Sequence, residues 1–535
     1  MNYDVLNQPY VSNRYCVSAR NGMVSTGSAL ASAAGIEILR KGGNAVDAAV
    51  ATAAALTVVE PTANGLGSDA FAIVWMKDHL YGLNGSGYSP YDISLKKVKK
   101  EHCEMPVYGW TPVTVPGAVK SWKNLIERFG ALSLKEDLEP AIRYAEEGYP
   151  LSPLLAASWK NAEKKFHAQF DGKREFAEWF RVFSNDGAPY EFGDIVTLKD
   201  HAKTLRLIAA SNTDAFYKGE IAQQMVRQSE RDGGYFCLKD LQEYDTEWVE
   251  PICLNYRGVD VVELPPNGQG IVALMALNIL KNFEFADRDS ADTLHKQLEA
   301  IKIAFADAKH YVSDPKDMSV SAEDLLKDAY GISRAREITD AAGIPLYSDP
   351  KSRGTVYLCT ADREGNMVSY IQSNYMGFGS GIVLEGYGVA LQNRGADFSL
   401  HEEDVNALAG HKKTYHTIIP GFLMQRGKAI GPFGVMGGYM QPQGHVQVVM
   451  NLVDFHLNPQ MALDAPRWQW IKEREVLLEA AFPKDVVREL KAKGHDITIA
   501  ENRGSFGRGQ IIQRLENGVL IGGCESRTDS NIACF

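Results

Sequence analysis

The alternation of apolar and polar positions is clearest between residues 355 and 375, where it predicts a β-hairpin. The segment TVYLCTA is rich in β-branched and aromatic residues, the turn residues DREGN follow it, and MVSYIQSNY returns as a second strand. Gly354 places a residue without a side chain directly before Thr355. A flexible position therefore precedes a hydroxyl that opens a strand.

Elsewhere the apolar positions predict three regions of different character. A strand-like NGMVSTGS is followed by a helix that ends at Gly42 and by an alanine-rich helix over 45–59. Residues 117–345 are mostly helix-like, 355–455 contain short strands separated by glycines, and 455–495 return to helix before a strand-rich tail. This order favours a layered α+β architecture over a repeated βαβ unit.

Composition is that of a globular protein with a substantial core. The 535 residues are 45% hydrophobic and 23% charged, with a formal net charge of −11. The chain has no block rich in Lys and Arg, so we expect no nucleic-acid partner. The alanine-rich helix has about 15 residues and contains Asp47, whereas a membrane span needs about 20, so we also expect no membrane segment.

The seven cysteines are scattered and never form a CxxC pair, which argues against a disulfide framework or a zinc cage. Reduced thiols, together with an N-terminus that lacks the apolar core of a secretory signal, predict a cytoplasmic location. His411, His416 and His445 are too irregularly spaced for a metal-ligand pattern, and no nucleotide-binding glycine motif is found. We therefore expect no metal and no organic cofactor.

Thr355 becomes a candidate nucleophile if the chain is cut before it. Attack of its own hydroxyl on the preceding peptide bond would free an α-amine with an ordinary pKa of about 7.7–8.0. That amine could take the hydroxyl's proton as the oxygen attacks a carbonyl. A loop that simply meets a sheet is the alternative, and the local pattern leaves both open.

Seven segments in order carry a resemblance to a known family. They are GGNAVDAAVA (42–51), EPTANGLGSDAF (60–71), TVPGAV (114–119), PPNGQG (265–270), the hairpin with GFGSGIV, LQNRGADFSL (391–400) and GVMGGYMQPQGH (434–445). From about residue 20 to 500 the chain resembles the γ-glutamyltranspeptidase family, including its cephalosporin-acylase-like members. The resemblance implies an N-terminal-nucleophile hydrolase fold, a four-layer αββα sandwich of the α+β class. It also implies self-cleavage between Gly354 and Thr355 into a large subunit, 1–354, and a small subunit, 355–535, that stay together.

The resemblance assigns roles to the reaction machinery. Thr355 corresponds to the nucleophile, and Ser373 stands where the family has a second hydroxyl beside it. Gly437 and Gly438 match the pair whose backbone N–H groups form the oxyanion hole. An ordinary strand serine and a tight glycine turn are the alternatives at these places.

Substrate recognition departs from the family. Tyr88 stands where the family has an arginine, and His416 with Thr417 stands where it has a serine pair, both of which hold the carboxylate of a γ-glutamyl group. Tyr375 replaces an asparagine and Arg394 an acidic or amide residue on the side of its amino group, where Asp397 is retained. Tyrosine cannot supply the fork of donors with which arginine binds a carboxylate, although Arg394 could restore a positive charge. We expect acyl-transfer chemistry with a weakened preference for the glutamyl head group, and Asp397 as the partner of its ammonium.

The predicted function is that of a self-processing γ-glutamyltransferase-like acyltransferase or amidohydrolase. It would cleave small γ-glutamyl or related acyl amides through a threonine acyl-enzyme and release the acyl group to water or to an amine. A glutaryl- or cephalosporin-type acylase is one alternative, and an uncleaved, catalytically silent homologue acting as a binding protein is another. The sequence leaves the oligomeric state open, a homo-oligomer included.

Overall fold

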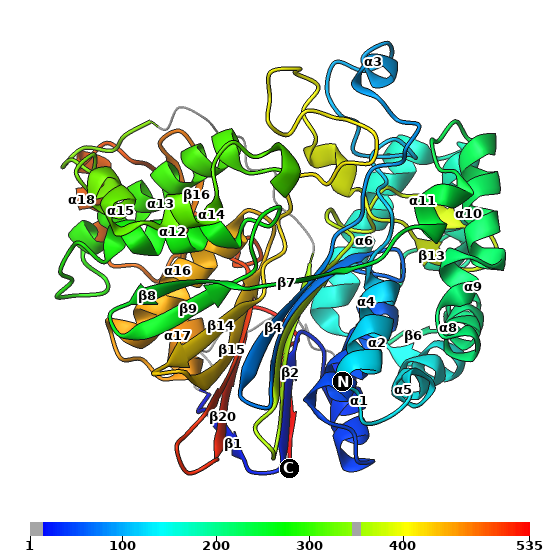
Figure 1. Ribbon diagram of the computed structural model, residues 1–535, viewed down its shortest axis with the longest axis horizontal. Coiled ribbons are helices and arrows are strands. Elements are labelled where there is room, and N and C mark those ends of the chain that lie inside the picture. Colours follow the sequence, from blue (N-terminus) through cyan, green and yellow to red (C-terminus); the bar gives the residue numbers. More distant parts are fainter. Residues whose placement is uncertain (1–13, 345–354) are drawn as a thin grey trace.

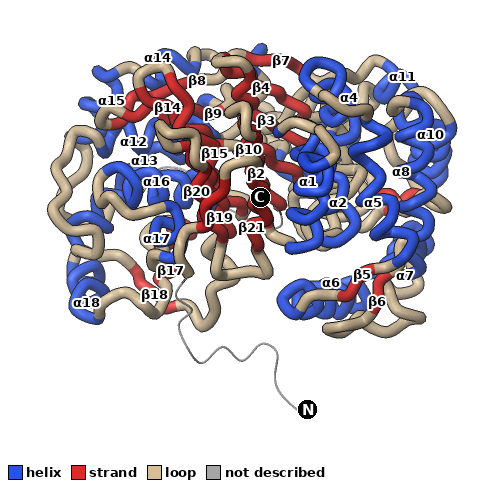
Figure 2. Tube along the Cα trace, turned by 90° about the horizontal axis from the view of Figure 1, so that it is seen from below, coloured by secondary structure: helices blue, strands red, loops and turns tan. Residues whose placement is uncertain are grey.

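The computed structural model describes residues 14–344 and 355–535, so Gly354 of the predicted cleavage site lies outside the described residues. Two β-sheets stand face to face in the middle of the molecule, and a layer of helices covers the outer face of each (Figure 1). The view from below shows the same order, with strands in the centre and helices on both sides (Figure 2). The fold is the predicted four-layer αββα sandwich.

Sheet 1 carries the predicted hairpin at its centre. Its seven strands, in spatial order, are β21 (Asn531–Cys534), β2 (Gly22–Thr26), β10 (Val356–Asp362), β11 (Met367–Ser373), β3 (Asp69–Met76), β4 (His79–Gly85) and β7 (Glu247–Val249). Every residue of β10 and β11 is buried, because helices cover one face of the sheet and sheet 2 covers the other.

Sheet 2 is also seven-stranded. Its order is β1 (Val17–Ala19), β20 (Leu520–Cys524), β19 (Arg508–Arg514), β15 (Lys428–Met436), β14 (Gly421–Gln425), β9 (Val259–Glu263) and β8 (Ile252–Tyr256). Neighbouring strands in both sheets are antiparallel.

The helix layers follow from the apolar segments of the sequence. Those on the side of sheet 1 are α1 (Ala29–Arg40), α2 (Ala45–Val59), α4 (Ala118–Phe129), α5 (Leu134–Glu147), α6 (Pro153–Phe170), α8 (Lys199–Ser211) and α10 (Glu220–Arg231). Those on the side of sheet 2 are α12 (Gly270–Leu280), α13 (Ala291–Tyr311), α16 (Met440–Val453), α17 (Pro459–Asp464) and α18 (Lys484–Ala492). The predicted alanine-rich helix α2 is buried at all of its positions, and it begins with a capping box between Asn44 and Asp47. Within the described residues, no helix combines the length and apolarity required to cross a bilayer.

Three predicted regions contain elements that the sequence did not indicate. The helical middle includes strands β7, β8 and β9, and the β-rich region ends with helix α16. The prediction of helix over 455–495 is wrong in part, because β16 (Trp468–Lys472) and β17 (Glu475–Leu478) lie there and form a small sheet with β18 (Asp496–Ile499), which follows this range. Trp468 and Trp470 lie on β16, and the indole N–H of Trp468 donates to Gln297 of α13 at 2.8 Å. All seven cysteines are free.

Candidate active site

Thr355 directly precedes β10, and its hydroxyl lies beside that of Ser373, the last residue of β11. Val356 pairs with Gln372, so one further step along the two antiparallel strands brings residues 355 and 373 together. The Oγ1 of Thr355 is 3.1 Å from the Oγ of Ser373, and both side chains are buried. Tyr375 donates its backbone N–H to the same serine oxygen at 2.8 Å. This bond holds the serine hydroxyl in reach of the threonine.

The facing strand β15 brings the glycine pair to the same place. Cys359 of β10 lies 3.7 Å from the carbonyl of Pro432, and the ring of Tyr357 packs on Gly434. Cys359 thus faces Pro432, and Tyr357, two residues earlier in β10, faces Gly434, two residues later in β15. One more step of two residues puts Thr355 opposite Met436.

Gly437 and Gly438 follow Met436 and have φ angles of 141° and 60°, in a region that favours glycine. Their backbone N–H groups donate to no acceptor among residues 14–344 and 355–535. Two unused donors therefore stand at the end of the strand that faces the nucleophile.

A buried pair of Asp69 and His416 adjoins Ser373. Asp69 is the register partner of Ser373 in sheet 1, and its Oδ2 accepts a hydrogen bond from His416 Nε2 at 2.9 Å. The Nδ1 of His416 accepts from the backbone N–H of Ile418 at 3.3 Å, which fixes the tautomer with its proton on Nε2. Burial, with Arg394 and Lys413 nearby, holds the pKa of His416 well below its ordinary value. Burial also raises the pKa of Asp69 to about 7, against the lowering effect of those two cations. The imidazole is neutral and acts as a fixed donor.

Arg394 is the central cation of this group. Its guanidinium is 1% exposed, donates from Nη1 to Thr417 Oγ1 at 2.7 Å, and lies 3.8 Å from Asp69 Oδ2. Its carbon atom Cζ stands 4.1 Å from the centre of the Tyr375 ring. Within the described part of the chain, Nε and Nη2 have no hydrogen-bond acceptor. Nε is the atom that faces Asp69 Oδ2, so Nη2 is the better placed to meet an anionic group of a ligand, because burying an unused donor of a charged group costs free energy.

Asp397 is already engaged by hydroxyl groups. Its Oδ1 accepts from Tyr375 at 2.7 Å and from Tyr439 at 3.1 Å, while its Oδ2 lies 3.6 Å from Arg394 Nη1. Lys309 of α13 donates to the Tyr439 hydroxyl, so a second cation stands close by. A substrate ammonium would have to displace a phenol or compete with a guanidinium here.

Tyr88 has no contact with Ser373, Arg394 or Asp397 within the described residues. Its hydroxyl donates to Glu247 at 2.7 Å, its ring stacks on His411, and the amine of Lys413 lies 5.0 Å from the ring centre. None of its contacts within the described residues joins it to Thr355. Of the other sequence-predicted residues, Ser373 contacts Thr355 directly. Contacts with Ser373, Asp69 and one another link the remaining side chains to it, and strand register places the glycine pair; these residues are Tyr375, Arg394, Asp397, His416, Thr417, Gly437 and Gly438.

Three members of the group were missed by sequence reasoning. Asp69 lies in the GSDAF motif and Tyr439 directly follows the glycine pair, so both were within segments that carried the resemblance. Lys309 lies in a helix whose pattern indicated only core packing, and no signal in the sequence could have found it.

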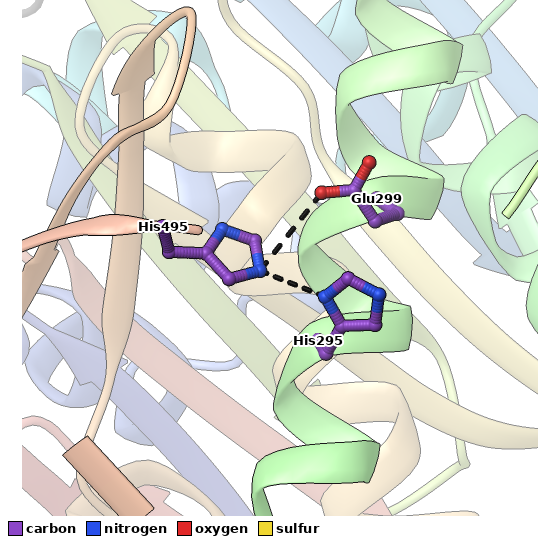
Figure 3. A group of neighbouring side chains, drawn as sticks. All are labelled: His295, Glu299 and His495. Carbon is purple, nitrogen blue, oxygen red and sulfur yellow. Dashed lines mark hydrogen bonds and ion pairs between the residues drawn. The ribbon is translucent and has the colours of Figure 1, made fainter. Parts of the chain in front are cut away.

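A separate cluster of residue types that can bind metal, His295, Glu299 and His495, lies between α13 and the turn before β18 (Figure 3). His295 and Glu299 are one turn apart on α13, and the Nε2 of His495 is 2.8 Å from His295 Nδ1 and 3.9 Å from Glu299 Oε1. Lys302 already pairs with Glu299 at 2.8 Å. Burial, followed by the positive charges of Lys302 and its neighbours, lowers the pKa of His495 to about 3. Surroundings that disfavour one more proton also disfavour a divalent cation, so the donor set is a poor fit for a metal.

Comparison with known proteins agrees with this geometry. The family model described as gamma-glutamyltranspeptidase matches residues 31–535. The crystal structure of a cephalosporin acylase from Bacillus halodurans superposes with a TM-score of 0.97 at 53% sequence identity, and covers 100% of this chain and 99% of that one. The glutathione hydrolase-like YwrD proenzyme of Bacillus subtilis is 36% identical over 95% of this chain and 97% of its own length. The glutathione hydrolase proenzyme of Escherichia coli is 30% identical over 96% and 91%, respectively.

The resemblance drawn from seven short segments is confirmed, as are the fold class and the prediction that the protein is an enzyme of the self-processing amidohydrolase or acyltransferase type. The silent binding protein is thereby the weaker alternative. The matches span nearly the whole chain, and the chain belongs to the γ-glutamyltranspeptidase family of N-terminal-nucleophile hydrolases.

Proposed function

We propose that the protein cuts its own chain between Gly354 and Thr355, and then uses Thr355 to transfer the acyl group of a small amide to water or to an amine. The observation that carries the proposal is the buried hydrogen bond between the hydroxyls of Thr355 and Ser373, at the end of a strand that faces two unused glycine N–H groups. The products of the cut are a large subunit, 1–354, and a small subunit, 355–535. Sheet 1 supports their staying together, because β10 and β11 of the small subunit are bonded between β2 and β3 of the large one.

Processing needs no outside reagent except water. The Oγ1 of Thr355 attacks the carbonyl carbon of residue 354, the C–N bond breaks, and the nitrogen takes up the proton to become an α-amine. Water then hydrolyses the resulting ester and releases the carboxylate of residue 354 and the free hydroxyl. One peptide bond and one water molecule become one carboxylate and one ammonium group.

Turnover repeats the same chemistry on a substrate. The α-amine takes the proton of Oγ1 as this oxygen attacks the amide carbonyl, and Ser373 supports the oxygen with its hydrogen bond. The N–H groups of Gly437 and Gly438 hold the oxyanion, a type of contact worth about 2.7–4 kcal/mol of barrier. The leaving amine departs with the proton, and water or a second amine then attacks the ester and frees the threonine.

The acyl group is set by the charges around Arg394. The Nη2 of this buried guanidinium, which has no hydrogen-bond acceptor among the described residues, suits a carboxylate at the far end of the acyl chain. Asp397 is taken by two phenols and by Arg394, so an α-ammonium gains little there. We therefore propose an acyl group of the glutaryl type, with a terminal carboxylate and without a required α-amine. The name of the Bacillus halodurans relative, a cephalosporin acylase, supports this choice over a γ-glutamyl substrate.

The test has two parts. Denaturing electrophoresis and mass spectrometry of the wild type should show two chains that divide at residue 355, and Thr355→Ala should give one uncut, inactive chain. The kcat/KM values for glutaryl and γ-glutamyl p-nitroanilides should then favour the glutaryl compound. A strong γ-glutamyl preference that is lost in Asp397→Ala would reject the proposed acyl group and leave the nucleophile in place.

The seven free cysteines favour a reducing compartment, and we propose a cytoplasmic location on that ground. Fractionation of the cells that make the protein, with immunodetection of the small subunit, tests it.

A further inference from the structure

The segment PPNGQG (265–270) runs from the loop after β9 into the first residue of α12, and Gln269 is its last residue before the helix. The side chain of Gln269 is fully buried. Its amide lies between the loop that contains Thr417 and the turn that contains Gly438. Gln269 belongs to the proposed large subunit and its two partners to the small one, so these contacts cross the boundary between the subunits.

The amide of Gln269 is fixed in one orientation. Its Nε2 donates to the backbone carbonyl of Thr417 at 2.6 Å and to that of Gly438 at 2.9 Å. Since carbonyl oxygens only accept, the atom that faces them is the nitrogen, and both of its protons are in use. Its Oε1 accepts from the hydroxyl of Tyr415 at 3.3 Å. The side chain therefore links two backbone segments on its donor side.

The glycine pair has few other supports. Gly437 and Gly438 have no side chains, and their N–H groups donate to no acceptor within residues 14–344 and 355–535. Their carbonyls accept from backbone N–H groups in the first turn of α16, at 3.1 Å each. Gln269 supplies the one side-chain hydrogen bond that the pair receives from the described part of the chain. It thus holds Gly438 from outside the strand and the helix that flank the turn.

The same amide reaches the side of the site where the acyl group is recognised. The Oγ1 of Thr417 accepts from Arg394 Nη1 at 2.7 Å. The loop of Thr417 is also held by backbone hydrogen bonds, from the N–H of Gln269 to the carbonyl of His416 at 2.8 Å and from the N–H of His416 to the carbonyl of Asn267 at 2.9 Å. Without the amide, this loop would keep two bonds to the segment, whereas Gly438 would keep none.

We propose that Gln269 is a positioning residue for acyl transfer: from the large subunit it holds the Gly438 carbonyl, and it thereby directs the N–H groups of the glycine pair towards the oxyanion beside Thr355. The inference rests on the proposed function, because it needs an oxyanion that the glycine pair binds. Formation and breakdown of the acyl-enzyme both pass through such an oxyanion, so a displaced turn slows both steps. Because the loop of Thr417 stays attached, loss of the amide should lower kcat more than it raises KM.

The experiment compares Gln269→Met with Gln447→Met. Gln447 is a buried glutamine two turns along α16, whose Nε2 donates to the backbone carbonyls of Gln443 and Trp468 at 3.1 and 3.0 Å. Each variant removes two buried donated bonds in nearly the same volume, so the falls in melting temperature should be similar. With the better of the glutaryl and γ-glutamyl p-nitroanilides, we expect kcat of Gln269→Met to fall about 10- to 100-fold and its KM to change less than about threefold, because a misplacement of about 1 Å costs about 100-fold. Gln447→Met should keep the wild-type kcat and KM.

Rates are counted per cut molecule, from the bands of denaturing electrophoresis. A wild-type kcat in Gln269→Met overturns the proposal, and so does a loss of kcat that Gln447→Met shares or a change confined to KM. If Gln269→Met does not fold, Gln269→Asn decides, because it keeps a buried amide on a side chain one methylene shorter. It should lower kcat in the same direction, and a wild-type kcat overturns the proposal equally.

Failure of the proposed function looks different, because it is seen in the wild type, as an uncut chain or one that releases no p-nitroaniline. A cut and active wild type, with Gln269 variants that turn over at the same rate, rejects only the role of Gln269.

Discussion

The hydroxyl of Thr355 lies 3.1 Å from the hydroxyl of Ser373, and the two residues begin and end a hairpin of two seven-residue strands, at its open end. The register of β10 and β11 sets this contact, and the backbone N–H of Tyr375 fixes the serine from the other side. The reacting oxygen is therefore oriented by the same strand pair that supplies it, and its position depends little on flexible loops.

Removing the Ser373 hydroxyl should slow the chemistry and leave the fold intact. Loss of a buried hydrogen bond to the nucleophile costs about 1–3 kcal/mol, so kcat of Ser373→Ala should fall roughly 5- to 150-fold. Self-cleavage, followed by electrophoresis over time, should slow as well, because the same oxygen attacks. Ser373→Thr keeps the hydroxyl and serves as the control. Equal rates in the alanine variant and the wild type would show that Ser373 is an ordinary strand residue.

The role of Gly437 and Gly438 as an oxyanion hole can be tested by comparing the effect of a substitution on stability with its effect on kcat. Gly438 has φ 60° next to the nucleophile, while Gly427 has φ 74° at the distant turn between β14 and β15. Alanine at either position should cost about 1–2 kcal/mol of stability, because both are in the left-handed region. Only Gly438→Ala should lower kcat, by about 100-fold, since it shifts the N–H groups that face Thr355. Thermal denaturation and p-nitroanilide turnover measure the two effects, and an equal loss of kcat in both variants would remove the pair from the mechanism.

The phenols on Asp397 predict a change in specificity. Tyr375→Phe removes one of the two hydroxyls that occupy Asp397 Oδ1, so a substrate ammonium can compete better for that oxygen. The ratio of kcat/KM for γ-glutamyl over glutaryl p-nitroanilide should rise several-fold. Tyr415→Phe is the control, because its hydroxyl donates to Gln269 at 3.3 Å and not to Asp397. An unchanged ratio in Tyr375→Phe would mean that Asp397 takes no part in acyl recognition.

The sequence was sufficient to predict the reacting strand pair, because its information is local. Alternating β-branched residues, a DREGN turn and an alanine-rich α2 each specify an element without reference to the rest of the chain. The strand over Trp468–Lys472 was missed because RWQW has no period that separates a short buried strand from a helix, and its burial depends on contacts with α13.

The contacts among Asp69, His416, Arg394 and Asp397 could not be predicted in the same way. Asp69 and His416 are 347 residues apart, and their pairing depends on how sheet 1 meets the loop before β14. Arg394 was expected to restore a positive charge for a substrate carboxylate. The structure shows that Asp69 and Asp397 already balance part of this charge, and the sequence does not give the distances between these segments. Family motifs identified the residues, and tertiary packing decided which of their atoms are still available.

Asp137 predicts how stability depends on pH. This carboxyl group lies on α5 against α2, fully buried, and neither oxygen has a hydrogen-bond partner within the described residues. Burial, followed by the charges of Asp47 and Glu136, raises its pKa to about 9, from about 3.9 in an unfolded chain. The folded state therefore holds this proton more tightly than the unfolded state does. The stabilisation is complete below about pH 4 and is lost as the pH rises towards 9, at up to about 1.4 kcal/mol per pH unit.

Asp137→Asn removes this titration, so the fall in melting temperature between pH 5 and pH 8 should be smaller than in the wild type. Glu136→Gln is the matched control. The carboxyl group of Glu136, next to Asp137 in the chain, is exposed and caps the helix, a role that glutamine can also fill. Differential scanning fluorimetry of the three proteins in buffers of constant ionic strength gives the comparison. Identical pH profiles for Asp137→Asn and the wild type would mean that the buried carboxyl has found a hydrogen-bond partner that keeps its pKa near the ordinary value.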